Sequence, residues 1–330
     1  MRLLFIRFSS IGDIVLTTPA IRCAKQQIPG VEIHFLTKRS MKEITEANPY
    51  IDHFHYLEND LNETIQRLKH IEFDHIIDLH NNLRTFKIKQ ALKAKATSYR
   101  KLSLLKLLLV KLHLNFLPDA HVCDRYMDTL KSFGVQYDGQ GLDYFLPESF
   151  VNNPIELPPT HQGDFAALVI GASYFTKKMP SDKLVELCNK MEYPIVLIGG
   201  KEDQAVGDLI ASSNPSKIFN TSGMLSMNGS AAVIKRAKLV LSNDTGFLHV
   251  ACAFKKPTVI FWGATTPVLQ FGAYYPLNSE VKSYNAIVPD LKCQPCSKQG
   301  THQCPKGHFK CMRLQDTQQI ANKANDFYSH

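Results

Sequence analysis

Several polar loops in this 330-residue chain carry the side chains best suited to chemistry. The first, Arg7-Phe8-Ser9-Ser10-Ile11-Gly12-Asp13, follows a short apolar run and precedes a helical pattern. Asp13 is either the N-cap of that helix, where the dipole favours its charge, or a general base that faces a ligand. Because the dinucleotide fingerprint needs three spaced glycines and this loop has only Gly12, an oxidoreductase is disfavoured.

A second loop, Gly171–Pro180, follows an apolar run that reads as a strand. It offers the Ser173 hydroxyl and two adjacent cations, Lys177 and Lys178. A bound diphosphate needs such hydrogen-bond donors and compact positive charges. The alternative is a solvated loop with ordinary surface lysines, and the spacing leaves open which lysine would bind.

Two further strand ends carry polar residues. Glu202 lies shortly after the strand end Ile198-Gly199-Gly200. From such a position a carboxylate often binds a ribose hydroxyl pair. Helix capping by Asp203 explains the two acidic residues equally well. Asp244-Thr245-Gly246 joins a strand to a helix, so backbone N–H groups and a hydroxyl converge there into an anion site. His249 lies on the first turn of that helix, where its role is either structural or ligand-binding.

The elements that position these loops alternate along the chain. Strands are predicted at 3–7, 32–36, 75–79, 165–170, 195–198, 239–242 and 258–262, and helices at 13–28, 40–47, 61–70, 120–133, 181–191, 203–212, 226–237 and 246–254. Such alternation predicts parallel sheets covered by helices on both faces. The proline-rich segment 147–163 predicts a linker, so we expect domains at 1–153 and 154–313 and a terminal helix within 314–330.

Composition limits the class of protein. The chain is 44% hydrophobic and 21% charged, as in globular proteins, and no apolar run reaches the roughly 20 residues of a membrane span. The apolar start resembles a signal peptide, but Arg7 interrupts it and no cleavage site follows, so we expect a first strand and a cytoplasmic protein. Cys23, Cys123, Cys188 and Cys252 sit in apolar patterns typical of reduced core cysteines.

The net charge of +8 is unevenly distributed. No acidic residue occurs between Asp78 and Asp119, whereas lysines and arginines recur throughout that stretch. Such a segment indicates an anionic partner: nucleic acid, phosphorylated lipid or an acidic sugar. Within it, Leu102–Leu117 either lies on the membrane surface or receives a lipid-linked sugar, or it is a core helix with lysines on its wet side.

Four cysteines cluster near the C-terminus, with His302 and His308 nearby. They are Cys293, Cys296, Cys304 and Cys311. Their spacing is compatible with structural zinc but is not that of a standard finger. Reduced cysteines that pack a loop are the simpler interpretation.

Taken together, these motifs resemble the heptosyltransferases of glycosyltransferase family 9. The matching segments are Ser9–Pro19, Asp78–Arg84, Ser242–Gly246 with His249, Lys256–Pro267 and the cysteine-bearing tail that ends in Cys311-Met312. Each motif is weak alone, but they follow in the right order over nearly the whole chain.

The resemblance implies a GT-B fold, in which two Rossmann-like, doubly wound domains face a central cleft and the C-terminal helix crosses back to the first domain. It implies inverting, metal-independent transfer of a sugar from a nucleotide sugar, typically ADP-heptose, with no other cofactor. The implied acceptor is an anionic, lipid-linked lipopolysaccharide core. Peripheral contact with the inner membrane is then expected, and nucleic acid is not.

The resemblance also assigns roles to residues. Asp13 occupies the place of the general base, and Lys177 that of the lysine on the donor phosphates. The remaining donor-binding candidates are Ser173, Lys178, Glu202, Asp244, Thr245, Gly246 and His249. The acceptor-binding candidates are Ser10, Gly12, His80, Asn82 and Arg84. No metal ligand is implied.

Met179 departs from the family, which commonly has an aromatic residue before the proline. This departure leaves the donor contacts open, and a family 9 enzyme with another nucleotide sugar is an alternative. A non-catalytic module that binds nucleic acid through 84–111 would leave the Asp13 loop and the 242–249 turn unexplained. A nucleotide-sugar epimerase would normally need the glycine-rich loop that is missing.

Overall fold

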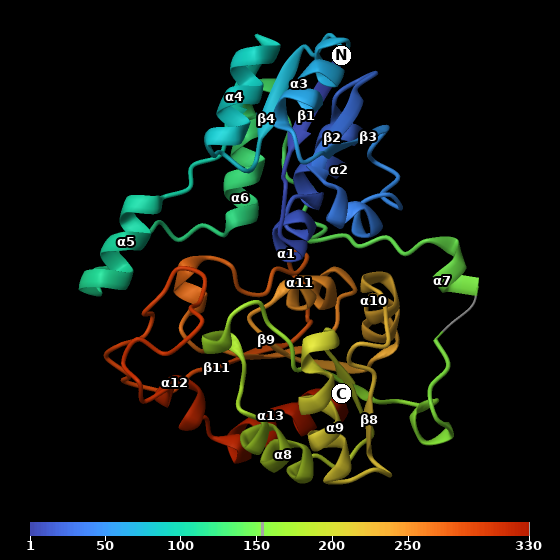
Figure 1. Cartoon of the computed structure of the whole chain (residues 1–330), viewed down its shortest axis with the longest axis vertical. Helices are drawn as coiled ribbons and strands as arrows, with labels where there is room; N and C mark the ends of the chain where they lie inside the picture. Colours follow the sequence, from blue (N-terminus) through green and yellow to red (C-terminus); the bar gives the residue numbers. More distant parts are fainter. Residues whose placement is uncertain (153–154, 330) are drawn as a thin grey trace. The chain divides into compact units, whose positions relative to one another are not determined.

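The computed structural model of the chain describes residues 1–152 and 155–329, which form two compact units (Figure 1). Unit 1 comprises Met1–Lys101 and Ala120–Phe145, and unit 2 comprises Leu102–Asp119 and the chain from Leu146 onward. Each unit is an α/β domain with a parallel sheet, which confirms the predicted fold class. The expected boundary at 153–154 falls outside the described residues.

Unit 1 contains a five-stranded parallel sheet in the order β3-β2-β1-β4-β5. Its strands are β1 (Arg2–Ile6), β2 (Glu32–Lys38), β3 (His53–Leu57), β4 (His75–Asp78) and β5 (Lys95–Ser98). The central strand β1 is a continuous apolar run from Leu3 to Ile6 because both faces of a parallel sheet are covered. The strand order reverses between β1 and β4, and ligands bind doubly wound sheets at such a switch point.

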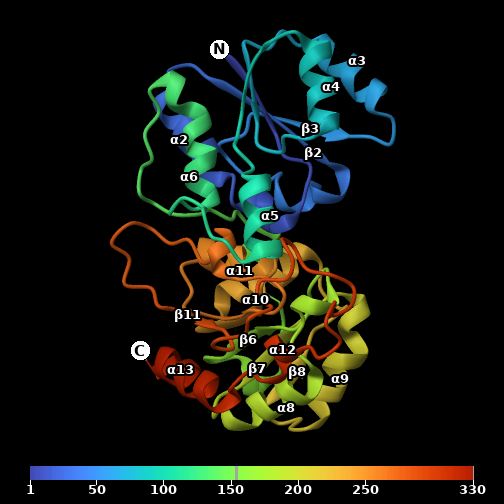
Figure 2. The same cartoon turned by 90° about the vertical axis from the view of Figure 1, so that its left-hand side faces the viewer.

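Helices cover both faces of the unit 1 sheet. They are α1 (Ile11–Val15), α2 (Thr18–Gln27), η1 (Arg39–Ile44), α3 (Leu61–Lys69), α4 (Leu83–Leu92), α6 (Val122–Met127) and η2 (Asp128–Phe133), where η denotes a 3₁₀ helix. Helix α2 lies beside α6, and α3 lies beside α4 (Figure 2).

The structure corrects several predicted elements of unit 1. The helix expected at 13–28 is two helices, because Pro19 lacks an N–H and is accepted only in the first turn of α2. The helix expected at 40–47 is the 3₁₀ helix η1, and that at 120–133 is split into α6 and η2. Strands β3 and β5 and helix α4 were not predicted. The two strands are short edge strands rich in polar residues, so they lack a continuous apolar run.

Unit 2 contains a six-stranded sheet in the order β11-β10-β9-β6-β7-β8, with all pairs parallel. Its strands are β6 (Ala166–Val169), β7 (Ile195–Ile198), β8 (Ile218–Asn220), β9 (Leu239–Asn243), β10 (Thr258–Phe261) and β11 (Ser283–Ala286). The four strands predicted from apolar runs are present, and the edge strands β8 and β11 were not predicted. The order reverses between β6 and β9, so the loops after these strands flank the switch point of this unit.

The helices of unit 2 include the last one in the chain. They are α5 (Ser103–Leu112), α7 (Glu148–Asn152), α8 (Ser181–Lys190), α9 (Gln204–Ser212), α10 (Met227–Arg236), α11 (Gly246–Ala253), α12 (Lys310–Arg313) and α13 (Thr317–Ser329), with 3₁₀ helices η3 (Pro159–His161), η4 (Phe175–Lys177), η5 (Lys201–Asp203) and η6 (Pro267–Leu269). Helix α13 lies against α8 (Figure 1). Because Ile320, Ala324 and Phe327 are buried in the core of unit 2, α13 packs within that unit.

Candidate functional site

Asp13 lies on α1, directly after the loop that leaves β1 at the switch point of unit 1. Its Oδ2 accepts hydrogen bonds from the backbone N–H and the hydroxyl of Ser10, each at 3.1 Å. The same oxygen lies 2.6 Å from Arg7 Nη2. The N-cap of α1 is therefore Ser10 rather than Asp13, the residue that the sequence had suggested; Asp13 is the third residue of the helix, completes a capping box with Ser10 and forms an ion pair that no local pattern indicated.

Arg7 connects several segments at the carboxyl end of the unit 1 sheet through hydrogen bonds. It is buried, and its guanidinium donates to the carbonyl of Ser9 at 3.0 Å, to that of Leu79 at 2.6 Å and to the Tyr126 hydroxyl at 3.0 Å. With Asp13 added, Arg7 connects the loops after β1 and β4 with helix α6. In the sequence, Arg7 is recognisable only as a charge that interrupts an apolar run, because its partners lie 72 and 119 residues away.

The surroundings of Asp13 keep it ionised. Burial alone would raise the pKa of its carboxyl, but the charge of Arg7 and the hydrogen bonds from Ser10 and Arg7 outweigh it. The net pKa of Asp13 is therefore below its usual value. The carboxylate is a proton acceptor throughout the neutral range.

Other acceptor-binding candidates gather on the same edge of unit 1. The ring centroid of His80 lies 4.8 Å from that of Phe8, and the guanidinium carbon of Arg84 lies 5.7 Å from the centroid of the Phe8 ring. Burial, with the charges of Arg7 and Lys101, lowers the pKa of His80 to about 4, so this imidazole is neutral at neutral pH. Arg84 is exposed and free to meet an anionic group.

Asn82 and Gly12 occupy structural positions on this edge. The Asn82 side chain accepts a hydrogen bond from the backbone N–H of Thr85 at 3.0 Å, which caps α4. Gly12 is buried within α1. Both residues therefore shape the loops on which Asp13 and His80 lie.

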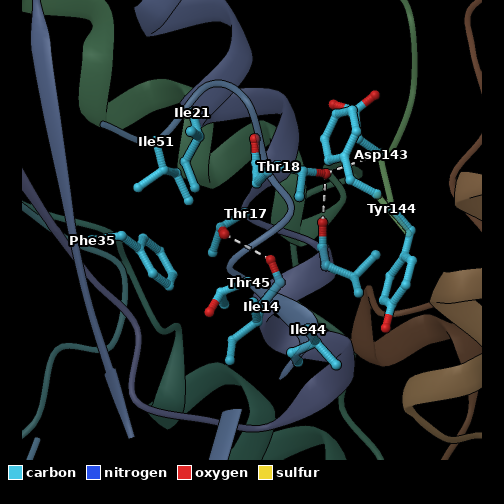
Figure 3. A pocket seen from close by; sticks show the side chains of 13 residues that line it. Ile14, Thr17, Thr18, Ile21, Phe35, Ile44, Thr45, Ile51, Asp143 and Tyr144 are labelled. Carbon is cyan, nitrogen blue, oxygen red and sulfur yellow. Dashed lines mark hydrogen bonds between the residues drawn. The ribbon is translucent and has the colours of Figure 1, made fainter. Parts of the chain in front are cut away.

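A small pocket lies beside α1 in unit 1 (Figure 3). Its lining is largely apolar and includes Ile14, Phe35 and Ile51. The Thr18 hydroxyl donates to the carbonyl of Val15 at 2.7 Å and accepts from the backbone N–H of Asp143 at 2.9 Å. Such a lining packs α1 in place and offers few groups to a charged sugar nucleotide.

In unit 2, Lys177 and Asp244 meet at the switch point between β6 and β9. Lys177 Nζ lies 2.7 Å from Asp244 Oδ2, which also accepts a hydrogen bond from the Thr265 hydroxyl at 2.7 Å. Asp244 is buried, whereas Lys177 is half-buried. The predicted lysine and the predicted turn are thus adjacent, and Thr265 is an additional member of the site.

Lys178 has a different partner from its neighbour. Its Nζ lies 2.5 Å from Asp203 Oδ1, and the other oxygen of Asp203 accepts from the backbone N–H of Gly200 at 3.0 Å. A Cβ at Gly171 would lie 2.5 Å from Asp203 Oδ2, so the loops after β6 and β7 approach closely only because glycine stands there. Lys178 therefore connects the loops after β6 and β7, whereas Lys177 forms an ion pair with Asp244 in the turn after β9.

Buried residues around Lys177 hold its loop in place. Asn243 Nδ2 donates to the carbonyl of Ile170 at 3.0 Å, and its Oδ1 accepts from the N–H of Met179 at 3.1 Å. The carbonyl of Thr176 accepts from the N–H of Ala264 at 3.0 Å, and a Cβ on Gly263 would overlap that carbonyl. The sequence pattern does not indicate these supporting roles, because the contacts are tertiary.

The turn after β9 has the geometry of an anion site. Thr245 is the N-cap of α11, where its hydroxyl oxygen accepts from the N–H of Phe247 at 3.3 Å. Gly246 begins the helix, so the positive end of the α11 dipole lies beside Lys177 and Asp244. His249 is buried on the first turn of α11. Glu202 and Ser173 are exposed on the loops after β7 and β6.

The cysteine tail contains free thiols. Cys293, Cys296 and Cys304 are partly buried and Cys311 is buried. Burial, with the neighbouring thiols, raises the pKa of Cys311 to about 12, so it is protonated at neutral pH. Among the described residues, these four sulfurs do not form a group with metal-ligand spacing.

Helix α5 and the residues just after it have large apolar side chains exposed at the surface. Leu104, Leu112 and Phe116, on the helix and just after it, are 68%, 60% and 61% exposed. Lys106 is buried instead, with its Nζ 4.2 Å from the ring centroid of Phe271. The expectation of lysines on the wet side of this helix is therefore wrong for Lys106, which makes a cation–π contact inside, whereas Lys111 is exposed as expected. No helix in the described part of the chain is long and apolar enough to cross a membrane.

Two doubly wound α/β units are the architecture of the GT-B fold, and known structures share it. A glycosyltransferase family 9 structure from Veillonella parvula matches with a TM-score of 0.75 at 18% identity and covers 99% of this chain and 97% of its own. The Escherichia coli ADP-heptose heptosyltransferase II matches with a TM-score of 0.73 at 16% identity and covers 100% of this chain and 99% of its own.

The sequence comparison gives the family. Residues 62–306 match the model of glycosyltransferase family 9 (heptosyltransferase). The chain belongs to this family and is a glycosyltransferase. Lipopolysaccharide heptosyltransferase 1 of Pseudomonas aeruginosa is 26% identical over 325 residues, which cover 90% of this chain and 86% of that protein. The resemblance inferred from the motifs is confirmed.

Proposed function

We propose that this protein is an inverting, metal-independent glycosyltransferase that moves heptose from ADP-heptose to a lipopolysaccharide core acceptor. The observation that carries the proposal is a difference between the two ion pairs. In unit 1 the carboxylate is the more exposed member, with the Asp13 side chain 23% and that of Arg7 8% exposed. In unit 2 the cation is the more exposed member, with Lys177 at 15% and Asp244 at 10%. The proposal assigns the acceptor end to unit 1 and the donor end to unit 2.

At the acceptor end, Asp13 takes the proton of the attacking sugar hydroxyl. Its ionised carboxylate is the form that a general base requires. As the O–H bond breaks, the oxygen forms a bond to the anomeric carbon from the side opposite the diphosphate, and the configuration inverts. Ser10 orients the carboxylate through its two hydrogen bonds, while His80 and Arg84 bind the rest of the acceptor.

At the donor end, the bond from the anomeric carbon to the diphosphate breaks, and the electron pair leaves with the diphosphate. Lys177 and the N–H groups at the start of α11 meet the negative charge where it develops. These fixed positive groups stabilise the leaving diphosphate, as a divalent metal ion does in other transferases. Glu202 binds the ribose hydroxyls, and Lys178, His249 and Ser173 complete the donor site.

Relatives support the identity of donor and acceptor. Solved structures of an Escherichia coli heptosyltransferase contain ADP and ADP-2-deoxy-2-fluoro heptose, at TM-scores of 0.68 and 0.67. The relative from Pseudomonas aeruginosa is a lipopolysaccharide heptosyltransferase, as is one from Escherichia coli that is 22% identical over 297 residues. An anionic lipid-linked acceptor also suits the exposed Arg84.

Helix α5 supports peripheral contact at the cytoplasmic face of the inner membrane. Its exposed leucines, with Lys111 exposed among them, offer an apolar surface next to positive charge. Cosedimentation with vesicles that contain phosphatidylglycerol tests this role. Leu104→Ser/Leu112→Ser should reduce binding, whereas Leu277→Ser, at another exposed leucine, should not. Equal binding of both variants would contradict the membrane role.

Thermal unfolding with different nucleotide sugars tests the donor. A ligand that binds only the folded chain raises its melting temperature in proportion to the logarithm of its concentration. We expect a larger rise with ADP-heptose than with GDP- or UDP-sugars at equal concentration, and no further rise when a chelator is replaced by Mg²⁺. A preference for another nucleotide would overturn the donor, and binding that requires the metal would overturn metal independence.

A further inference from the structure

Imidazole and carboxylate groups gather at the amino end of the unit 1 sheet, which is the end opposite to the loop of Asp13. Glu32 begins β2, and His34 follows two residues later on the same face of the strand. His53 begins the edge strand β3 and is the register partner of His34. Two neighbouring strands therefore bring three potential metal ligands to one place.

The ligand atoms of these three residues lie within 4.8 Å of one another. Glu32 Oε1 is 2.6 Å from His53 Nε2 and 3.4 Å from His34 Nε2. The rings of His34 and His53 are stacked, with centroids 4.5 Å apart. Two imidazole nitrogens and one carboxylate oxygen form the donor set of zinc sites that keep a fourth position open.

The Nε2 atom of His34 provides an independent indication of a ligand. His34 is only 3% exposed, and this nitrogen makes no hydrogen bond among the described residues. A buried polar atom without a hydrogen bond costs free energy, and most such atoms in proteins are satisfied. Because this nitrogen faces Glu32, a cation held by both groups would satisfy it.

Residues outside the group of three already orient the side chains of His34 and Glu32. The other ring nitrogen of His34, Nδ1, is 2.9 Å from His55 Nε2, a hydrogen bond that leaves Nε2 available as a lone pair when Nδ1 is the donor. Arg2 Nε donates to Glu32 Oε2 at 3.2 Å, which turns Oε1 toward the two histidines. Phe73 packs edge-on against His34 with centroids 5.1 Å apart. Metal sites use such second contacts to fix ring orientation and ligand geometry.

We propose that Glu32, His34 and His53 bind a divalent transition-metal ion of the zinc class. His53 and Glu32 are partly exposed, with side chains 51% and 37% exposed, so the ion enters from solvent. Bound there, it connects the edge strand β3 to β2. Because the cluster and the Asp13 loop are at opposite ends of the sheet, the metal stabilises unit 1 and takes no part in transfer.

The alternative is a simple ion pair between Glu32 and a protonated His53, and zinc titration distinguishes the two. The probe is Zn²⁺ in competition with a chromophoric chelator, added to the tag-free full-length protein at pH 7.5. His53→Ala removes an exposed ligand and Glu32→Gln removes a carboxylate, so neither leaves a cavity in the core. His70→Ala, at an exposed histidine of the same unit, is the matched control.

Wild-type protein and His70→Ala should bind one zinc ion at this site with equal affinity. His53→Ala and Glu32→Gln should each lose more affinity than the roughly 10–100-fold that the loss of an outer contact costs. Zinc should raise the melting temperature of the wild type but not of His53→Ala. The proposal is overturned if both variants bind zinc as the wild type does, or if micromolar zinc does not bind.

The absorption spectrum of bound Co²⁺ distinguishes this site from a site at the cysteine tail. Co²⁺ bound by two imidazoles and a carboxylate should show visible d–d bands and no intense thiolate charge-transfer band in the near ultraviolet, and His53→Ala should remove the visible bands. A thiolate band that persists in His53→Ala and disappears in Cys296→Ser would place the metal at the tail and overturn the proposal.

Discussion

Each unit joins an aspartate to a cation at the switch point of its sheet, but the two pairs are built in opposite ways. In unit 1 the cation is the anchored partner, because Arg7 also donates to two carbonyls and the Tyr126 hydroxyl. In unit 2 the carboxylate is the anchored partner, because Asp244 is buried and accepts from Thr265. The remaining member of each pair, Asp13 or Lys177, is the more exposed one.

Under the proposed function, this difference suits each ion pair to a different chemical role. A carboxylate with a fixed cation behind it stays ionised and oriented, as a base at the acceptor end must be. A lysine with a fixed carboxylate behind it is held at one position on its flexible stem, as a clamp on a leaving diphosphate must be. The position of each residue in its pair is thus consistent with its proposed role.

The largest expected effect follows from removing the carboxylate charge of Asp13. Asp13→Asn keeps the size of the side chain but cannot accept the proton, so the transfer rate should fall roughly 10²–10⁴-fold. Steady-state transfer assays measure this change. Asp128→Asn, at an exposed surface ion pair of the same unit, should retain the wild-type rate. Full activity in Asp13→Asn would refute its assignment as the base.

Removal of the cation in the other pair should have the next largest effect. Lys177→Ala loses the charge that meets the leaving diphosphate, and the transfer rate should fall on the order of 10²–10³-fold. Lys178→Ala is the matched control, since its partner is Asp203, and its loss should be smaller. Transfer assays on the two variants under the same conditions decide between the adjacent lysines. A larger loss in Lys178→Ala would reverse the assignment.

The pH profile tests what Arg7 does for Asp13. The pKa of Asp13 is lowered, so the carboxylate is lost only as pH falls through that depressed value, and the contribution of the pair to folding disappears over the same range. Arg7→Lys retains a charge but loses the guanidinium fork. In this variant we expect the acidic limb of the pH profile of kcat/KM to shift to higher pH by about one unit or more. Arg39→Lys, at an exposed pair with Glu58, should leave the limb in place, and an unmoved limb in Arg7→Lys would separate Arg7 from the base.

The smallest effect concerns Asn82, which caps α4 on the same edge of unit 1. Asn82→Ala should cost about 1 kcal/mol in the free energy of unfolding, as loss of an N-cap does. Asn82→Asp should restore most of that stability, which chemical denaturation measures. If Asn82 also contacts the acceptor, both variants should raise the KM for the acceptor; a KM that is unchanged in both would leave Asn82 a structural role alone.

Local pattern was sufficient for the central strands and for part of the site. Buried parallel strands such as β6 and β9 are largely apolar runs, and their ends locate the loops of Lys177 and Asp244. Edge strands such as β3 lack that pattern. The partners of Arg7 and the pairing of His34 with His53 depend on tertiary contacts and strand register, which the spacing of residues along the chain does not contain.

The central claim is that Asp13 serves the acceptor end and Lys177 the donor end. Calorimetric measurement of the dissociation constant for ADP-heptose in Asp13→Asn and Lys177→Ala, beside their transfer rates, tests it most directly. The account predicts that Asp13→Asn binds the donor as tightly as the wild type while transfer collapses, and that Lys177→Ala loses both. Weakened donor binding in Asp13→Asn together with unchanged binding in Lys177→Ala would contradict the account.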